Sequence, residues 1–198
     1  MPEIIPTSSW DKFYQITKDS PPWPLLQKAV ALLDHKDDAL DLGAGAGRDT
    51  VFLLEQGFHV TAVDRERSSI AILEGLPQQN LTLVQSAFAD FTFETYDIIN
   101  AQYALPFNPK QTFNEVLAKL KRALRPGGIF TGQFFGIHDE WNKPDVGMTF
   151  LTVEQVHELL RDLELIELQE VELDGTTADK TPKHWHLFHI IARKNAGI

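Results

Sequence analysis

The apolar residues of the chain fall into two kinds of segment, and their alternation predicts a sheet covered by helices. Five short segments are rich in β-branched or aromatic residues, as buried strands are. Between them, apolar residues recur every three or four positions, which is the spacing of one helical face. The predicted strands are residues 39–42, 58–63, 81–84, 96–101 and 129–135.

Three of the predicted helices have recognisable starts. One begins at Pro24, because proline suits the first turn of a helix. A second carries an apolar stripe over 113–124, with Asn108 suited to its N-cap and Pro109 to its first turn. The third opens with a capping-box pattern over 152–155. Because helices and strands alternate, we expect right-handed crossovers and a parallel sheet covered on both faces.

The last part of the chain departs from this alternation. Residues 165–173 and 184–192 are both extended stretches, and no helical spacing lies between them. The intervening residues 174–177 have turn-like composition. We therefore predict an antiparallel hairpin at the edge of the otherwise parallel sheet. At 198 residues, the chain has the length of one α/β domain.

Charge and composition limit the possible partners. The formal net charge of −10 disfavours nucleic acid as a partner, because an acidic surface repels phosphates. No apolar run approaches the ~20 residues that span a bilayer, and no signal-peptide pattern opens the sequence. We therefore expect a cytoplasmic protein with no membrane partner. The lack of cysteine excludes disulfides and thiolate chemistry. Nothing in the sequence determines the oligomeric state.

A glycine-rich loop is the strongest candidate for a binding site. Gly43, Gly45 and Gly47 follow the first strand and precede an apolar helical segment at 51–54. Glycines allow tight turns and close approach of the backbone to a ligand. The helix that follows offers free N–H groups to an anion, and Asp41 at the end of the strand accepts hydrogen bonds from a cation. This combination suits a zwitterionic amino-acid group better than a pyrophosphate.

Asp64 is the second candidate, because it closes the second strand 17 residues after the last glycine of the loop. In open α/β sheets an acid at this place accepts hydrogen bonds from ribose hydroxyls. An acid that merely caps a solvated turn is the structural alternative.

These residues resemble the class I S-adenosylmethionine-dependent methyltransferases, in particular the small-molecule branch near the tellurite-resistance and thiopurine methyltransferase-like proteins. The resemblance rests on the motif at 41–47, Asp64, the strand 96–100 and the segment 124–128. It implies an α/β fold with a Rossmann-like, seven-stranded, mostly parallel sheet in the order 3-2-1-4-5-7-6. Strand 7 is antiparallel, and helices cover both faces.

The resemblance also implies one methyltransferase domain over 1–198. An N-terminal lid or helical segment would occupy 1–35, and the Rossmann-like core would occupy 36–198. S-adenosyl-L-methionine is the implied cofactor, and a small molecule is the implied methyl acceptor. Methyl transfer from a sulfonium requires mainly positioning and exclusion of water, because the cofactor itself supplies the leaving group.

By the same resemblance, particular residues are assigned to the parts of the cofactor. Asp41 and the loop would hold the methionine end, Asp64 the ribose, and Arg65 would lie along the adenine. Many relatives have an aspartate after the third strand that receives the adenine amino group, and this chain has no acid there. The residues assigned to the cofactor are Asp41, Gly43, Ala44, Gly45, Gly47, Asp64, Arg65, Ser86, Ala87, Phe88, Asn100 and Tyr14.

The residues near the transferred methyl group are less well defined. The segment after the fourth strand faces the acceptor in this family, which makes Tyr103 a catalytic candidate together with Asn100 and Gln102. His138, after the fifth strand, is a candidate base, although a polar loop gives the same pattern. Tyr14 and Trp23 suit a lid, or else they simply cover the edge of the sheet.

We predict no metal site. His184 and His186 share one face of the predicted strand, His189 points to the other, and no carboxylate visibly converges on them.

Two other functions stay open. A nicotinamide-dependent oxidoreductase also uses a glycine loop and a distal acid, but its fingerprint requires glycine at the position of Arg48. A non-catalytic module could keep the fold to bind a partner or to sense the cofactor.

Overall fold

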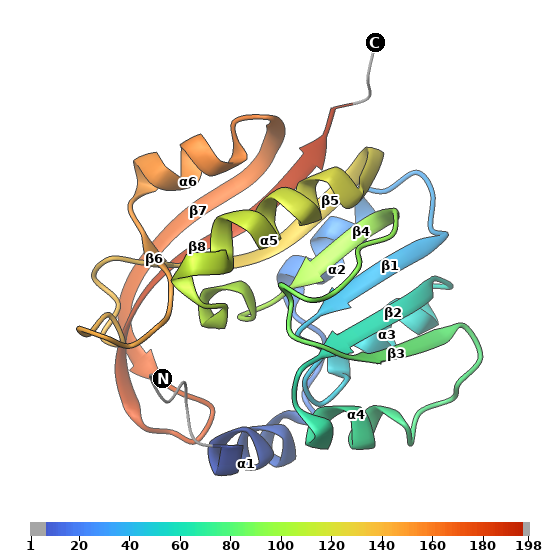
Figure 1. Ribbon diagram of the computed structural model, residues 1–198, viewed down its shortest axis with the longest axis horizontal. Helices are drawn as coiled ribbons and strands as arrows, with labels where there is room; N and C mark the ends of the chain where they lie inside the picture. The colour runs from blue at the N-terminus through green and yellow to red at the C-terminus, as the bar shows by residue number, and fades with distance from the viewer. Residues whose placement is uncertain (1–6, 196–198) are drawn as a thin grey trace.

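A mixed β-sheet forms the centre of the protein, and the computed structural model describes it within residues 7–195 (Figure 1). The first six residues of the predicted N-terminal segment lie outside the described residues. The strands are β1 (Asp38–Leu42), β2 (His59–Asp64), β3 (Leu81–Gln85), β4 (Tyr96–Ala101), β5 (Leu124–Gly136), β6 (Phe150–Leu151), β7 (Leu163–Thr176) and β8 (Pro182–Lys194).

The order of the strands confirms the predicted topology. The sheet runs β3-β2-β1-β4-β5-β8-β7, and β1 to β5 are parallel to one another. Strand β8 is antiparallel to both β5 and β7. Counted without the short β6, β8 is the predicted antiparallel seventh strand. The two-residue β6, which pairs in parallel with β5, was not predicted.

Helices cover both faces of the sheet (Figure 1). Helices α2, α3 and α4 pack their apolar sides on one face of the sheet, and α5 and α6 pack on the other face. Helix α1 lies below the carboxyl ends of the strands (Figure 1). None of the helices within residues 7–195 combines the length and the apolarity needed to cross a bilayer. They are α1 (Thr7–Thr17), α2 (Pro24–Ala31), α3 (Arg48–Glu55), α4 (Arg67–Leu73), α5 (Lys110–Ala123) and α6 (Val153–Leu160), with a 3-10 turn at Leu105–Phe107.

The boundaries of α5 differ from the prediction at both ends. Pro109 is the N-cap, and Asn108 instead donates its side-chain N–H to Thr112 Oγ1 at 2.9 Å. Leu124, predicted as the last residue of the helical stripe, is the first residue of β5 and pairs with Tyr96. Arg125 forms ion pairs with Asp38 and Asp97, which hold this segment against the neighbouring strands. Pairing with the sheet therefore overrides the apolar spacing.

The terminal hairpin is confirmed, but it is longer than predicted. Its strands continue to Thr176 and Pro182, and Gly175 pairs with Lys183 inside the ladder. The turn lies at 177–181 and not at 174–177, because the regular cross-strand pairing continues through the residues of turn-like composition. The predicted capping box is present, with Thr152 and Gln155 exchanging two hydrogen bonds at the start of α6.

Candidate active site

A cleft of about 1170 Å³ lies at the carboxyl ends of the central strands. Residues of β1, β2 and β4 form its floor, while α1 and the end of the β7–β8 hairpin form walls that are joined by the ion pair between Lys12 and Asp179. Figure 1 shows α1 lying below these strand ends, between the hairpin and α4. Typical ligand pockets have volumes of ~300–1,000 Å³, so this cleft has room for a cofactor and a small acceptor together.

The glycine loop forms one side of the cleft. Gly43 has a φ of 84°, and a Cβ there would lie 2.5 Å from the Cβ of Ala104. Glycine is thus required both by the backbone conformation and by the close approach of the segment after β4. Gly47 has a different role, since a Cβ there would lie 2.6 Å from Leu73 of α4. It lies outside the lining of the cleft and allows α3 and α4 to pack closely.

Two buried carboxylates meet behind this loop. The side chain of Asn100 donates to Asp41 Oδ1 at 2.9 Å and to Asp49 Oδ2 at 3.1 Å. Thr50 donates to the other oxygen of Asp41 at 2.6 Å, and the backbone N–H of Trp23 donates to the other oxygen of Asp49 at 3.0 Å. These four hydrogen bonds all come from neutral donors, and the nearby Arg48 offsets the negative charge of the carboxylates only in part. A cationic group that enters here therefore meets an acidic environment.

The ionisation of Asp41 reflects this environment. Burial, and secondarily the charge of Asp49, raise the pKa of Asp41 to about 7. Burial also raises the pKa of Asp49, an effect that the nearby Arg48 partly offsets. A bound cation would favour the charged form of both carboxyls and lower these pKa values.

Asp64 links the end of β2 to the glycine loop. One of its oxygens accepts a hydrogen bond from the backbone N–H of Gly45, and the other accepts one from Glu66, each at 2.9 Å. Burial raises the pKa of Asp64. Arg65 lines the cleft next to Asp64, and its Nε donates to Glu66 at 2.8 Å.

The structure brings most of the predicted site residues together in this one cleft. Gly47, Ser86 and His138 do not line it. Ser86 Oγ donates to the carbonyl of Ala87 at 2.9 Å. The predicted residues that line the cleft are Tyr14, Asp41, Gly43, Ala44, Gly45, Asp64, Arg65, Ala87, Phe88, Asn100 and Tyr103.

His138 is an exposed residue on the far side of the hairpin, and the structure gives no support for its assignment as a base. Its Nδ1 lies 3.1 Å from Glu172 of β7. Glu172 pairs with His186, whereas the adjacent Trp185 is the residue of β8 that lines the cleft. Because side chains alternate between the faces of a strand, the His138 contact is on the face turned away from the cleft.

A chain of amide side chains connects the carboxylates to Tyr103. Gln102 donates to Asn100 Oδ1 at 2.9 Å, and Gln133 donates to Gln102 Oε1 at 2.7 Å. Gln133 Oε1 accepts from the backbone N–H of Tyr103 at 2.8 Å. Tyr103 has a φ of 51°, which is uncommon for a residue with a side chain. The network therefore holds Tyr103 in an unfavourable conformation at the edge of the cleft.

Aromatic rings form the other end of the cleft, and few of them could be assigned to it from the sequence. Tyr103 and Trp23 have ring centroids 4.7 Å apart, and Trp141 and Trp185 lie 5.5 Å apart. They come from four distant segments, and only the alternation along β8 could have pointed to Trp185. We refer to Trp23, Tyr103, Phe135, Trp141 and Trp185, which all line the cleft, as the aromatic wall.

Two cations lie against the aromatic wall. The Arg48 guanidinium lies 3.9 Å from the Trp23 ring centroid, and its Nη2 is buried without a hydrogen-bond partner among the described residues. Lys183 Nζ lies 3.8 Å from the Trp185 ring centroid and 2.5 Å from Asp139 Oδ1. Both side chains of this ion pair are buried, so Lys183 supports the ring without lining the cleft.

Comparison with known sequences relates the first part of this site to a family. A family described as methyltransferase domain matches residues 39–128, which include the loop, Asp64 and β4. Over 93 residues the chain is 33% identical to the cypemycin N-terminal methyltransferase of a Streptomyces species. That match covers 45% of this chain and 38% of the relative, so the chain spans well under half of the relative's length.

Comparison with solved structures extends the likeness to nearly the whole chain. TehB from Haemophilus influenzae superposes with a TM-score of 0.77 at 20% identity, over 93% of this chain and 66% of that one. The 1,6-didemethyltoxoflavin-N1-methyltransferase of Burkholderia thailandensis superposes with a TM-score of 0.66 at 25% identity, over 95% of this chain and 84% of that one. The chain therefore resembles class I S-adenosylmethionine-dependent methyltransferases, in sequence over residues 39–128 and in fold over nearly its whole length.

Proposed function

We propose that this protein transfers a methyl group from S-adenosyl-L-methionine to a small-molecule acceptor. The observation that carries the proposal is the pair of buried carboxylates behind the glycine loop. Asp41 and Asp49 share one amide donor and have no cationic hydrogen-bond partner, which suits the ammonium group of an amino acid. Asp64 lies at the end of the next strand, where a ribose would follow.

The shape of the loop also fits this cofactor. Cβ atoms at Gly43 and Gly45 would point at Ala104 and at the ring of Tyr14, so the backbone here lies close to both of its neighbours. Tyr14 is 3% exposed, and its ring would lie 3.4 Å from a Cβ on Gly45, which supports a role for α1 in covering the bound cofactor. Ala87 and Phe88 line the cleft beyond Asp64 and supply apolar surface for an adenine ring.

The residues of the chain would act mainly by positioning. The cofactor, when bound, supplies an electrophilic methyl group and its own leaving group. The amide network sets the position of Tyr103, and the aromatic wall excludes water from the acceptor end. Burial raises the pKa of Tyr103 to about 12, so its hydroxyl keeps its proton at neutral pH and orients the acceptor as a hydrogen-bonding group. We therefore assign Tyr103 to positioning and do not propose His138 as a base.

The acceptor end favours a flat and largely apolar small molecule. Aromatic rings from four segments line it, and such rings gain most from stacking on a planar ligand. One solved relative, at 25% identity, is named as an N1-methyltransferase with 1,6-didemethyltoxoflavin and S-adenosylhomocysteine bound. The cytoplasmic location expected from the sequence stays a prediction.

The test is calorimetric titration with S-adenosylmethionine and S-adenosylhomocysteine, followed by transfer of a labelled methyl group to a panel of planar amines, phenols and thiols. We expect the Asp64→Ala variant to bind ~10- to 100-fold more weakly than the wild type, because a charged hydrogen-bond partner contributes ~1.5–3 kcal/mol. Asp90→Ala, which removes an exposed acid outside the cleft, is the matched control and should bind normally.

Three results would change this conclusion. Absence of binding by folded wild-type protein would overturn the proposal, and binding of a nicotinamide dinucleotide in its place would favour an oxidoreductase. Tight binding of the cofactor with no methyl transfer to any acceptor would favour the non-catalytic module.

A further inference from the structure

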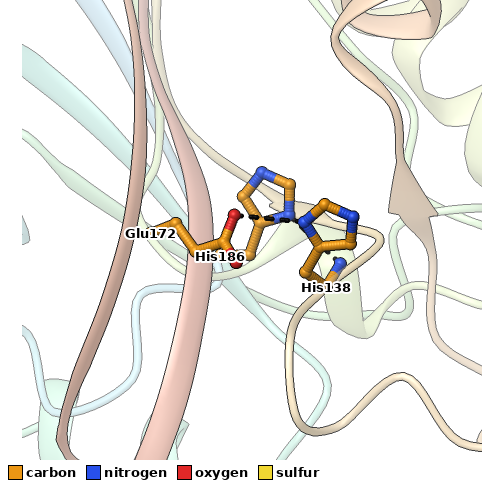
Figure 2. Close-up of side chains that lie close together, drawn as sticks. All are labelled: His138, Glu172 and His186. Atoms are coloured by element: carbon orange, nitrogen blue, oxygen red, sulfur yellow. Dashed lines mark hydrogen bonds and ion pairs between the residues drawn. The ribbon is translucent and has the colours of Figure 1, made fainter.

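Three side chains that could bind a metal meet on the face of the hairpin turned away from the cleft. His138 follows β5, Glu172 lies in β7 and His186 lies in β8, and Figure 2 shows the three turned toward one another. One ligand atom from each residue lies within 4.8 Å of the other two. The prediction that no carboxylate converges on the histidines is therefore wrong, because the pairing of β7 with β8 places Glu172 directly opposite His186.

His186 is the most strongly fixed of the three. It is 2% exposed, and its ring lies over Gly136, where an added Cβ would come within 2.1 Å of Nδ1. The backbone N–H of His138 donates to His186 Nδ1 at 3.1 Å, so this nitrogen carries a lone pair and no proton. The opposite nitrogen, Nε2, then donates to Glu170 at 2.8 Å. Histidines that bind metals commonly have this arrangement, with the second ring nitrogen held by a carboxylate.

Glu172 lies between two histidines. One of its oxygens is 3.1 Å from His138 Nδ1, and the other is 3.2 Å from His184 Nε2. Ligand atoms bound at ~2.0–2.2 Å in a tetrahedral site lie roughly 3.3–3.5 Å apart. The distance of 3.1 Å between His138 Nδ1 and Glu172 Oε2 is therefore already close to the distance between two ligand atoms of a tetrahedral site.

We propose that His138, Glu172 and His186 form a binding site for a divalent transition-metal ion, with zinc the best match. Two imidazole nitrogens and one carboxylate are a ligand set typical of zinc, whereas magnesium and calcium prefer oxygen ligands. His138 and Glu172 are exposed, so solvent can supply the fourth ligand. His138 moves slightly on binding, because its backbone N–H must release His186 Nδ1 to the metal. Its ring proton must also move from Nδ1, where it is donated to Glu172, to the solvent-facing Nε2, so that Nδ1 can bind the metal.

The position of this site connects it with the acceptor end of the cleft. His138 begins the segment that carries Trp141, and His186 is the neighbour of Trp185. A metal ion would therefore join the two segments that carry the facing tryptophans of the aromatic wall. Binding to the folded form alone would also stabilise the protein by mass action.

The test uses the full chain without a polyhistidine tag, stripped with a chelator and titrated with zinc chloride in a calorimeter. We expect one ion per chain, a micromolar or tighter dissociation constant, and a higher melting temperature with zinc than with chelator. Magnesium chloride at the same concentration should give neither effect. Cobalt should give a visible absorption band that reports its coordination.

Variants assign the binding to these residues. Glu172→Gln and His138→Ala change exposed side chains and should each weaken zinc binding at least tenfold while the protein stays folded. His157→Ala removes an exposed histidine of α6 outside this cluster and should bind zinc as the wild type does. Absence of saturable zinc binding, or equal binding by all three variants, would overturn the proposal and leave the cluster as a hydrogen-bonded surface network.

Discussion

The two ends of the cleft are built in different ways. The cofactor end comes from one continuous βαβ unit, in which β1, the glycine loop, α3 and β2 follow one another between residues 38 and 64. The acceptor end takes single residues from distant segments, among them Trp23, Tyr103, Trp141 and Trp185. Local chain geometry can therefore define the first end, whereas the second exists only after β5 and the hairpin have assembled.

The two ends also differ in their electrostatics. Behind the loop, buried carboxylates have raised pKa values and neutral partners, so this end can respond to a bound cation. Behind the aromatic wall, the buried charge of Lys183 is already paired with Asp139. The cofactor end thus keeps negative charge that a bound cation can neutralise. At the acceptor end, Lys183 and Asp139 neutralise each other, and Lys183 packs against the ring of Trp185.

The largest effect on stability is expected at the acceptor end, where Lys183 and Asp139 form a buried ion pair. Lys183→Met leaves Asp139 buried without its cation, which should lower the free energy of unfolding by ~3–5 kcal/mol in urea titrations. The double variant Lys183→Met/Asp139→Asn removes both charges, keeps a side-chain acceptor for the backbone N–H of Trp141, and should recover part of that loss. A double variant as unstable as the single one would show that packing around the rings, and not the unpaired charge, dominates this region.

The glycine loop offers a test of close packing with a matched control. Gly43 and Gly57 have similar φ values of 84° and 93°, but only Gly43 has a neighbour within reach of an added Cβ. Gly43→Ala should destabilise by ~2–4 kcal/mol and prevent binding of S-adenosylhomocysteine, whereas Gly57→Ala should lose only the ~1–2 kcal/mol of left-handed strain and bind normally. If the two variants lost equal amounts of unfolding free energy and of binding affinity, the contact between residue 43 and Ala104 would be unimportant.

The raised pKa of Asp41 predicts a dependence of stability on pH. A carboxyl whose folded pKa is about 7 stabilises fully below its ordinary pKa near 4, and that contribution is lost as the pH rises through 7. The free energy of unfolding of the wild type, relative to Asp41→Asn, should therefore fall between about pH 4 and about pH 7. A difference that is flat or rises with pH would contradict the burial of this carboxyl.

The same carboxyl predicts an effect on cofactor binding. An ammonium group next to Asp41 lowers its pKa, so binding at pH 7 should release protons. Calorimetry in buffers of different ionisation enthalpy measures this release, which should be smaller in Asp41→Asn. Equal proton release in the two proteins would place the ammonium group elsewhere.

The smallest effect is expected for the Tyr103 hydroxyl. Tyr103→Phe keeps the ring of the aromatic wall, so stability and cofactor affinity should change by less than ~0.5 kcal/mol. If the hydroxyl orients the acceptor, methyl transfer should slow several-fold while S-adenosylhomocysteine binds as before. A large loss of cofactor affinity would instead place Tyr103 in the cofactor end.

The sequence was a good guide where structure depends on neighbours along the chain. The apolar runs indicated β1 to β5, and the capping box indicated α6, because each signal lies within the element that it describes. Asp41, Gly43 and Asp64 could be assigned to one site because the ends of adjacent parallel strands meet at one edge of a sheet. The hairpin was predicted, but its turn was misplaced because the ladder extends beyond the apolar residues.

Only the tertiary structure decided which distant residues meet. The burial of Asp49 against Asn100, and the pairing of Lys183 with Asp139 behind Trp185, depend on contacts across many residues of chain. The convergence of His138, Glu172 and His186 depends on the register between β7 and β8, where a shift of one residue would turn Glu172 to the other face. The sequence by itself therefore determined the fold and the cofactor end, while long-range pairing determined the acceptor end and the histidine cluster.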